Sequence, residues 1–379
     1  MSDQAITHDE STAPVTEANV ATQEDLDEAM PAARLSRRTW LLFGLFVILA
    51  VGFLYFFLPQ LAGLDNTWRR IKHGDPVWLA VAIVLEACAW GGYVLLFRTV
   101  FVRGDSRIDW SESFQITMAA LAATRLLNAA GAGGIALTAW ALRRSGMERR
   151  TVACRMVAFL VLLYAVYMLA LIVFGLGLHF GVFNGPDPVA VTIVPAGLAA
   201  FAVVVLLAIS LLPSDFERVV ARWGTGHRRM RLVRLAQRLA TAPASVATGV
   251  RTAIMLVRER RVGVLGAFMW WGFDICVLWA AFHAFGDNPP YFAVIVMAYF
   301  VGMLGNLLPL PGGIGGVDGG MIGAFILFDV DKSYALVAVL SYRAFAFWLP
   351  TFPGALAYLA LRRTVARWRE ERATIQSEV

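Results

Sequence analysis

The sequence predicts an all-α polytopic membrane protein, built as an inverted repeat of helices with two glycine-rich re-entrant hairpins. Hydrophobic residues make up 59% of the chain and charged residues 16%, against about 45–50% and about 25% in soluble domains. Several apolar runs reach the ~20 residues that a helix needs to cross a bilayer. Glycine-rich stretches interrupt apolar sequence once in each half, at 126–135 and 307–317.

Residues 1–39 are predicted to form a disordered acidic tail with a basic juxtamembrane end. Eight of the 27 acidic residues lie in 1–33, which contains no lysine or arginine. Such a segment has too little apolar surface to fold by itself. The first long apolar run begins only at Trp40, behind this polar tail, so a cleavable signal peptide is not expected.

The transmembrane domain is predicted over 40–365. Its continuous apolar spans are 40–58, 77–101, 152–180, 190–212, 262–285 and 334–361. The stretches 113–142 and 291–328 are also apolar, but the glycine loops break them. Irregular backbone at membrane depth survives only where protein covers it or where it lines a wet cavity. Each stretch is therefore interpreted as a re-entrant hairpin of two half-helices, with two short spans as the alternative.

The arginine distribution predicts the orientation, because short cytoplasmic loops are enriched in Lys and Arg. Loop 143–151 holds four arginines and segment 213–261 holds eleven, whereas loop 181–189 holds none. Both termini, including the tail 366–379, are then cytoplasmic, and the protein is a multi-pass protein of the cell membrane. Loop 59–76 disagrees, since it should be external and yet carries basic residues.

This topology makes the two halves of the domain inverted copies of each other. The block 77–180 contains a span, a hairpin entering from the inside and a second span. The block 262–361 contains the same elements in the opposite orientation. Paired glycine breaks between inverted repeats are a sequence pointer to a transport site.

Charged side chains inside the predicted spans are functional candidates, because burying a charge in a membrane is costly. Arg125 precedes the first glycine loop, Arg155 lies near the cytoplasmic end of its span, and Arg343 lies about half way along the last span. A guanidinium offers phosphate a bidentate donor fork and a persistent charge. For Arg155, snorkelling to the interface is the alternative. Glu86 and Asp274 lie in mid-span, at the same 188-residue offset as Arg155 and Arg343.

These two acids are predicted charge partners of the arginines. Pairing would keep an empty cavity near neutral. Two alternatives remain open: one of the acids takes up a proton during transport, or the acids form a fixed structural ion pair.

The glycine loops are candidate anion sites, because half-helix N-termini present unpaired N–H groups and glycine permits close approach. The candidate binding residues in and beside them are Asn128, Gly131, Gly133, Gly134, Asn306, Gly312, Gly313, Gly315 and Asp318. Asp318 suits the N-cap of the returning half-helix. No nucleotide-binding P-loop is present. No catalytic residue, metal site or cofactor is expected.

Segment 213–261 interleaves apolar residues with its arginines. This pattern is typical of a basic amphipathic helix on the anionic cytoplasmic leaflet. Nucleic acid is the competing partner for such charge, and the flanking spans argue against it.

Several motifs resemble the lysylphosphatidylglycerol synthase transmembrane-region family. In the second half they are Leu307–Gly316 with Asp318, Arg343, Trp348-Leu349-Pro350, Pro353-Gly354 and Tyr358, and in the first half the glycine loop with Ala139–Arg144. The resemblance implies a flippase-like inverted-repeat fold, with lipid translocation proposed for the best-known members, the multiple peptide resistance factors. Those proteins carry a C-terminal aminoacyl-transferase domain. This chain ends about 18 residues after its last predicted span, so that enzymatic activity is not expected.

The favoured function is a transporter or flippase that moves or binds an anionic phospholipid or polyprenyl-linked lipid. An aquaporin-like solute channel is one alternative, since Asn128 and Asn306 lie near two oppositely inserted half-helices. The Asn-Pro-Ala triplet is missing, however, and buried charges do not suit a neutral pore. A non-catalytic membrane partner of a lipid or cell-envelope synthase is another alternative, and a homodimer is compatible with each of these functions.

Overall fold

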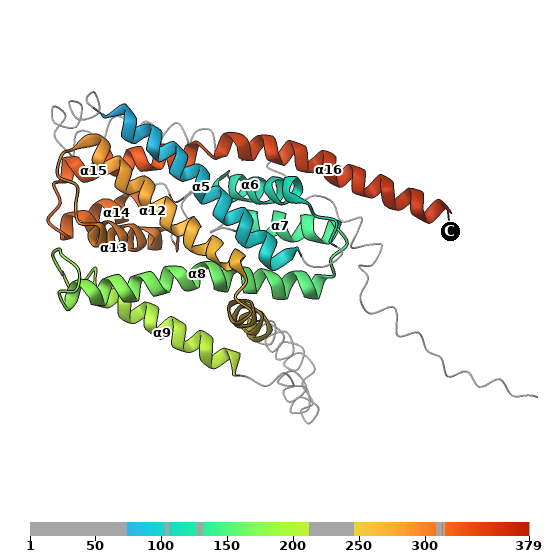
Figure 1. Ribbon diagram of the computed structural model, residues 1–379, viewed down its shortest axis with the longest axis horizontal. Helices are drawn as coiled ribbons and strands as arrows, with labels where there is room; N and C mark the ends of the chain where they lie inside the picture. The colour runs from blue at the N-terminus through green and yellow to red at the C-terminus, as the bar shows by residue number, and fades with distance from the viewer. Residues whose placement is uncertain are drawn as a thin grey trace, which may run out of the picture.

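The computed structural model describes residues 74–102, 106–126, 132–211, 246–307, 313 and 315–378, and every regular element in these ranges is a helix (Figure 1). In chain order they are α5 (Pro76–Phe101), α6 (Trp110–Leu126), α7 (Ala132–Arg144), α8 (Arg149–His179), α9 (Ile193–Ser210), a helix at 246–258, the 3₁₀ turn η2 (Val262–Val264), α12 (Leu265–Phe285), α13 (Phe292–Met303), the 3₁₀ turn η3 (Leu304–Leu307), α14 (Gly316–Leu327), α15 (Lys332–Arg343), the π-helical turn η5 (Ala344–Trp348) and α16 (Thr351–Glu378). The tail 1–39 and the predicted span 40–58 lie outside the described residues.

Five helical segments among the described residues are long and apolar enough to cross a membrane. They are Pro76–Phe101, Arg149–His179, Ile193–Ser210, Val262–Phe285 and Lys332–Glu371. Each overlaps one predicted span. The expectation of an all-α membrane protein is confirmed.

The last of these segments differs from the single continuous span predicted at 334–361. It consists of α15, the π-helical turn η5 and α16. Pro350 follows the turn and has no N–H to donate, so the regular i to i−4 hydrogen bonding cannot continue. The N–H of Leu349 donates to the carbonyl of Ala344, five residues back, over 3.1 Å. The break therefore has a local cause in the sequence.

The helices α5 and α12 lie side by side along much of their length (Figure 1). Their close approach depends on small residues, as is common between membrane helices. A Cβ atom at Gly92 would lie 2.9 Å from the carbonyl oxygen of Gly266. At the start of α5, the Asp75 carboxylate accepts a 2.8 Å hydrogen bond from the N–H of Val77, and Pro76 is the first residue of the helix. These are favoured residues for beginning a helix.

Two pairs of short helices complete the bundle. α6 packs against α7, and α13 packs against α14. The α13–α14 pair lies at one end of the long axis, and the α6–α7 pair lies nearer the middle of the molecule (Figure 1). α6 also packs along α16, which carries the chain from the centre of the bundle to its C-terminal end.

The helix at 246–258 is the described part of the predicted amphipathic segment 213–261. Its buried residues recur at helical spacing and include Ala247, Val250 and Leu256. Arg251 donates from Nε to the carbonyl of Ser210 at the end of α9, over 3.0 Å. This helix therefore packs one face against the rest of the protein, while its exposed residues include the apolar Ile254, Met255 and Val257. Residues 213–245 lie outside the described residues.

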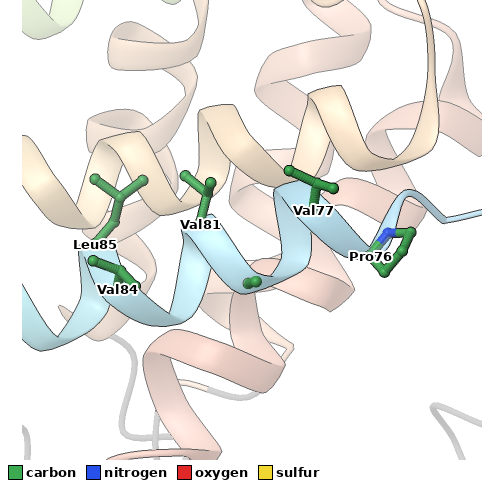
Figure 2. A pocket seen from close by; sticks show the side chains of 6 residues that line it. Pro76, Val77, Val81, Val84 and Leu85 are labelled. Carbon is green, nitrogen blue, oxygen red and sulfur yellow. The ribbon is translucent and has the colours of Figure 1, made fainter.

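An open apolar groove of about 550 Å³ runs along the first turns of α5 (Figure 2). It is lined by Pro76, Val77, Ala80, Val81, Val84 and Leu85. Val77 and Val84 are 67% and 62% exposed. In a membrane, such a surface suits contact with hydrocarbon rather than with a charged ligand.

Candidate functional site

The candidate site lies where the last membrane segment is interrupted. Arg125, in the last turn of α6, and Arg343, the last residue of α15, both approach the ring of Phe347 in η5. Their guanidinium carbons lie 5.7 Å and 4.7 Å from the ring centroid, respectively. Two arginines from distant parts of the sequence thus meet at one aromatic side chain, at distances typical of cation–π contacts.

Arg125 contacts the backbone that the π-helical turn exposes. Its two terminal nitrogens donate to the carbonyls of Ala346, over 2.7 Å, and Phe347, over 3.2 Å. The helical partner of the Ala346 carbonyl would be the N–H of residue 350, which proline lacks. Arg125 therefore supplies a donor to a carbonyl that Pro350 leaves without one, and this uses two of the five guanidinium N–H groups.

Arg343 forms an ion pair with Asp318 on α14, with Nε 2.6 Å from Oδ1. The two side chains are only 13% and 9% exposed. The other carboxylate oxygen of Asp318 accepts a 3.0 Å hydrogen bond from the N–H of Gly315. Asp318 caps α14 as expected, but from the third helical position, because Gly315 is the N-cap residue at φ 83°. Glycine suits this left-handed backbone conformation, and the carboxylate still satisfies the first N–H of the helix.

Glu86 on α5 and Asp274 on α12 are buried beside this ion pair, with 1% and 6% of their surfaces exposed. Glu86 accepts a 2.7 Å hydrogen bond from the indole N–H of Trp90. Asp274 accepts hydrogen bonds from the hydroxyl groups of Tyr299 and Tyr342.

The two carboxyl groups are also in hydrogen-bonding contact with each other, and Arg125 is the cation that faces both. Oε2 of Glu86 is buried, and no N–H or O–H donor from the described residues reaches it. Of the predicted pairing of acids and arginines, the structure places Arg125 toward both acids, whereas the ion pair of Arg343 is with Asp318 and the hydrogen bonds of Arg125 are with carbonyls. The acids are partners of each other because α5 and α12 pack closely.

Arg155 lies apart from this cluster, near the start of α8. It donates a 2.9 Å hydrogen bond to the carbonyl of Phe101, the last residue of α5. Carbonyls at a helix C-terminus lack intrahelical donors, and a cationic side chain satisfies them well. The structure thus places Arg155 at a helix end.

The glycine-loop candidates are described only in part, because Asn128, Gly131 and Gly312 lie outside the described residues. Gly133 and Gly134 are in the first turn of α7, where Gly134 is buried and a Cβ atom would lie 2.6 Å from the carbonyl of Ala120 on α6. Gly313 is buried with φ 66°, and a Cβ atom there would lie 2.6 Å from the Asn306 side-chain oxygen. These glycines allow the close backbone packing that frames the site.

The aromatic residues of the cluster are absent from the sequence prediction. Trp90, one helical turn after Glu86, and Tyr342, next to Arg343, could have been found from their spacing to a charged residue. Phe347, one helical turn after Arg343, could have been found in the same way. Tyr299 lies in uniformly apolar sequence, and only the packing of α13 identifies it.

Comparison with known proteins identifies one family across most of the chain. Residues 41–354 match the family model described as the lysylphosphatidylglycerol synthase TM region. The resemblance noted in the sequence is thereby confirmed, and the matched region contains no C-terminal transferase domain.

Curated relatives carry only a general name. A UPF0104 membrane protein from Methanothermobacter thermautotrophicus is 36% identical over 113 residues, which are 29% of this chain and 31% of that protein. Another from the same organism is 23% identical over 302 residues, covering 76% of this chain and 86% of the relative. A third, from Pyrococcus horikoshii, is 27% identical over 108 residues, which are 28% of this chain and 32% of that protein. The chain thus spans less than a third of the first of these relatives, but most of the second.

Proposed function

Because the chain belongs to the lysylphosphatidylglycerol synthase transmembrane-region family, we propose that it binds the phosphate of an anionic lipid headgroup and moves that headgroup across the cytoplasmic membrane. The observation that carries the proposal is the meeting of Arg125 and Arg343 at Phe347. Two guanidinium groups at one buried place form a strong binding site for phosphate, because each presents a planar fork of donors.

The ion pair between Arg343 and Asp318 gives the empty site a resident anion. A headgroup phosphate carries the same charge and the same kind of acceptor oxygens as the Asp318 carboxylate. It can therefore pair with Arg343 in place of the carboxylate, so that the cation stays paired while Asp318 keeps its hydrogen bond from the N–H of Gly315. Exchange of one anion for another lets the headgroup enter and leave the site.

The lengths of the short helices support a passage that is open to each side in turn. α13 and α14 have 12 residues each, or about 18 Å of helix, against ~30 Å of hydrocarbon. The α6–α7 pair lies nearer the middle of the molecule, apart from α13 and α14 (Figure 1). We interpret the two pairs as re-entrant hairpins of an inverted repeat, with both chain termini in the cytoplasm. The lipid tails then remain in the bilayer beside apolar helix faces such as the groove on α5.

The proposed role is binding and transport rather than catalysis, since the matched family region is a transmembrane region. A neutral-solute channel is less well supported than lipid transport. The described cluster contains two arginines and three acids. Buried charges of this kind suit the binding of a charged group and do not suit a pore for neutral solutes.

Reconstitution tests the proposal directly. Purified full-length chain is placed in vesicles with a trace of fluorescent phosphatidylglycerol, and dithionite added outside bleaches only the outer leaflet. Wild-type protein should make nearly all of the label accessible, whereas Arg125→Gln should leave the inner-leaflet fraction protected. A fluorescent phosphatidylcholine, which is zwitterionic, and a polyprenyl phosphate identify the lipid class.

Arg98→Gln is the matched control. Arg98 is a half-buried arginine that donates to Ser113 over 3.0 Å and stacks on Trp110, outside the cluster. This variant should translocate lipid as the wild type does. The proposal fails if wild-type vesicles bleach no further than protein-free vesicles for every anionic lipid.

A further inference from the structure

The buried acids Glu86 and Asp274 present a problem of charge and of hydrogen bonding. Their carboxyl groups contact each other, yet two carboxylates are both acceptors and repel each other. Two ionised carboxyl groups at hydrogen-bonding distance in a buried place are not tolerated together. Oε2 of Glu86 is also buried without any described N–H or O–H donor, so the pair lacks a hydrogen at one of its oxygens.

The charges around the pair lead to the same conclusion. Within the described part of the chain, Arg343 and Asp318 form one ion pair and so cancel. Arg125 then faces the two carboxyl groups of Glu86 and Asp274. One shared proton on the two acids makes the empty cluster neutral, which is the cheapest state for a buried group of charges.

The other titratable groups around the pair do not change this count. Those that face it are Tyr299 on α13 and Tyr342 on α15. Tyrosine is neutral near neutral pH. The hydroxyl groups of Tyr299 and Tyr342 donate to Asp274, so they stabilise whichever charge remains on the pair and supply none of their own.

We infer that Glu86 and Asp274 share one proton in the empty protein and take up a second proton when an anionic headgroup binds, so that lipid and proton move together. The inference rests on the proposed function. A headgroup phosphate adds one negative charge to a neutral cluster. A proton from the aqueous phase that protonates the remaining carboxylate restores neutrality, and no other atom or electron moves. The Glu86–Asp274 pair is thus a proton-binding site coupled to the lipid site at Arg125 and Arg343.

Linkage gives the sign of the pH dependence. A ligand whose binding takes up a proton binds more tightly when protons are plentiful, so affinity should fall as pH rises. The slope is at most about tenfold per pH unit for one proton. Where the pair already holds two protons, at low pH, uptake ends and the affinity becomes constant.

The test uses the full-length chain in neutral detergent and the soluble probe dioctanoyl phosphatidylglycerol. This phosphodiester keeps one charge over the pH range studied, so it takes up no proton itself. Titration calorimetry in two buffers with different ionisation enthalpies counts the protons taken up for each lipid bound. Wild-type protein should take up close to one proton, with an affinity that falls as pH rises.

The variant Glu86→Gln with Asp274→Asn imitates the doubly protonated pair. Its amides keep acceptors for Trp90, Tyr299 and Tyr342 and can donate to each other, so the fold is retained. It should bind the probe with no proton uptake and with an affinity independent of pH. Glu112→Gln is the control: Glu112 is also buried, but its partners are the indole of Trp368 and the N–H of Asp109, so uptake should stay at the wild-type value.

Each outcome decides something. Wild-type binding without proton uptake, or unchanged uptake in the double variant, overturns the coupling while leaving lipid binding intact. A wild-type chain that binds no anionic lipid at any pH overturns the proposed function, and the coupling with it.

Discussion

Removal of the Arg343 charge is the perturbation that best separates a binding role from a structural one. In the wild type, Nε of Arg343 lies 2.6 Å from the carboxylate of Asp318, whose side chain is only 9% exposed. The variant Arg343→Gln removes this cation and leaves the buried carboxylate behind. Breaking a buried ion pair by removing one partner costs about 3–5 kcal/mol. We expect a loss toward the lower end of that range, because the N–H of Gly315 still donates to the carboxylate.

The double variant Arg343→Gln with Asp318→Asn removes this penalty. The amide oxygen that the second change introduces would still accept a hydrogen bond from the N–H of Gly315, and no buried charge is left unpaired. The residual loss should be about that of one hydrogen bond, ~0.5–1.5 kcal/mol. Unfolding in mixed micelles, followed by tryptophan fluorescence, measures both variants against the wild type.

Translocation of the fluorescent anionic lipid is then measured for the stable double variant. We expect translocation to be lost, because one of the two guanidinium groups that bind phosphate is gone. Arg343→Lys should retain part of the activity, since lysine keeps the charge but lacks the planar fork. If the double variant is stable and translocates lipid at the wild-type rate, Arg343 is structural and the site lies elsewhere.

Two further changes test the fold around the site. Gly92→Leu should prevent the close packing of α5 on α12 and sharply lower the yield of folded protein, because its Cβ atom would lie 2.9 Å from the carbonyl oxygen of Gly266. Gly91→Leu is the control and should express as the wild type does, since nothing lies within 4 Å of the added Cβ atom. Equal yields of the two variants would contradict the packing argument. Pro350→Ala restores an N–H that can donate to the carbonyl of Ala346, so it should straighten the π-helical turn and release Arg125. Translocation in the vesicle assay should then fall, while thermal stability should not. Translocation at the wild-type rate would show that the break in the helix is dispensable.

Much of the membrane architecture could be predicted from the sequence. A helix in lipid satisfies its own backbone hydrogen bonds, so a run such as 152–180 specifies a span almost independently of its neighbours. The continuous spans and the helices of the stretches 113–142 and 291–328 could be predicted from this local rule. The break at η5 was also encoded locally, in Pro350, but the apolar character of 334–361 concealed it.

The candidate charges could also be identified from sequence, because arginines and acids inside apolar runs are rare and costly. Their partners could not. Asp318 is a helix cap and is also the ion-pair partner of Arg343, because α14 packs against α15. Glu86 and Asp274 face Arg125 and also contact each other where α5 packs on α12, and the sequence pattern does not indicate this second contact.

The sequence by itself therefore determined that this protein is a bundle of membrane helices with charges buried inside it. Only the tertiary structure decided which charges neutralise one another and which aromatic groups surround them. The reason is physical: hydrophobicity acts along each segment separately, whereas an ion pair or a shared proton depends on distances of a few ångströms between helices far apart in the chain.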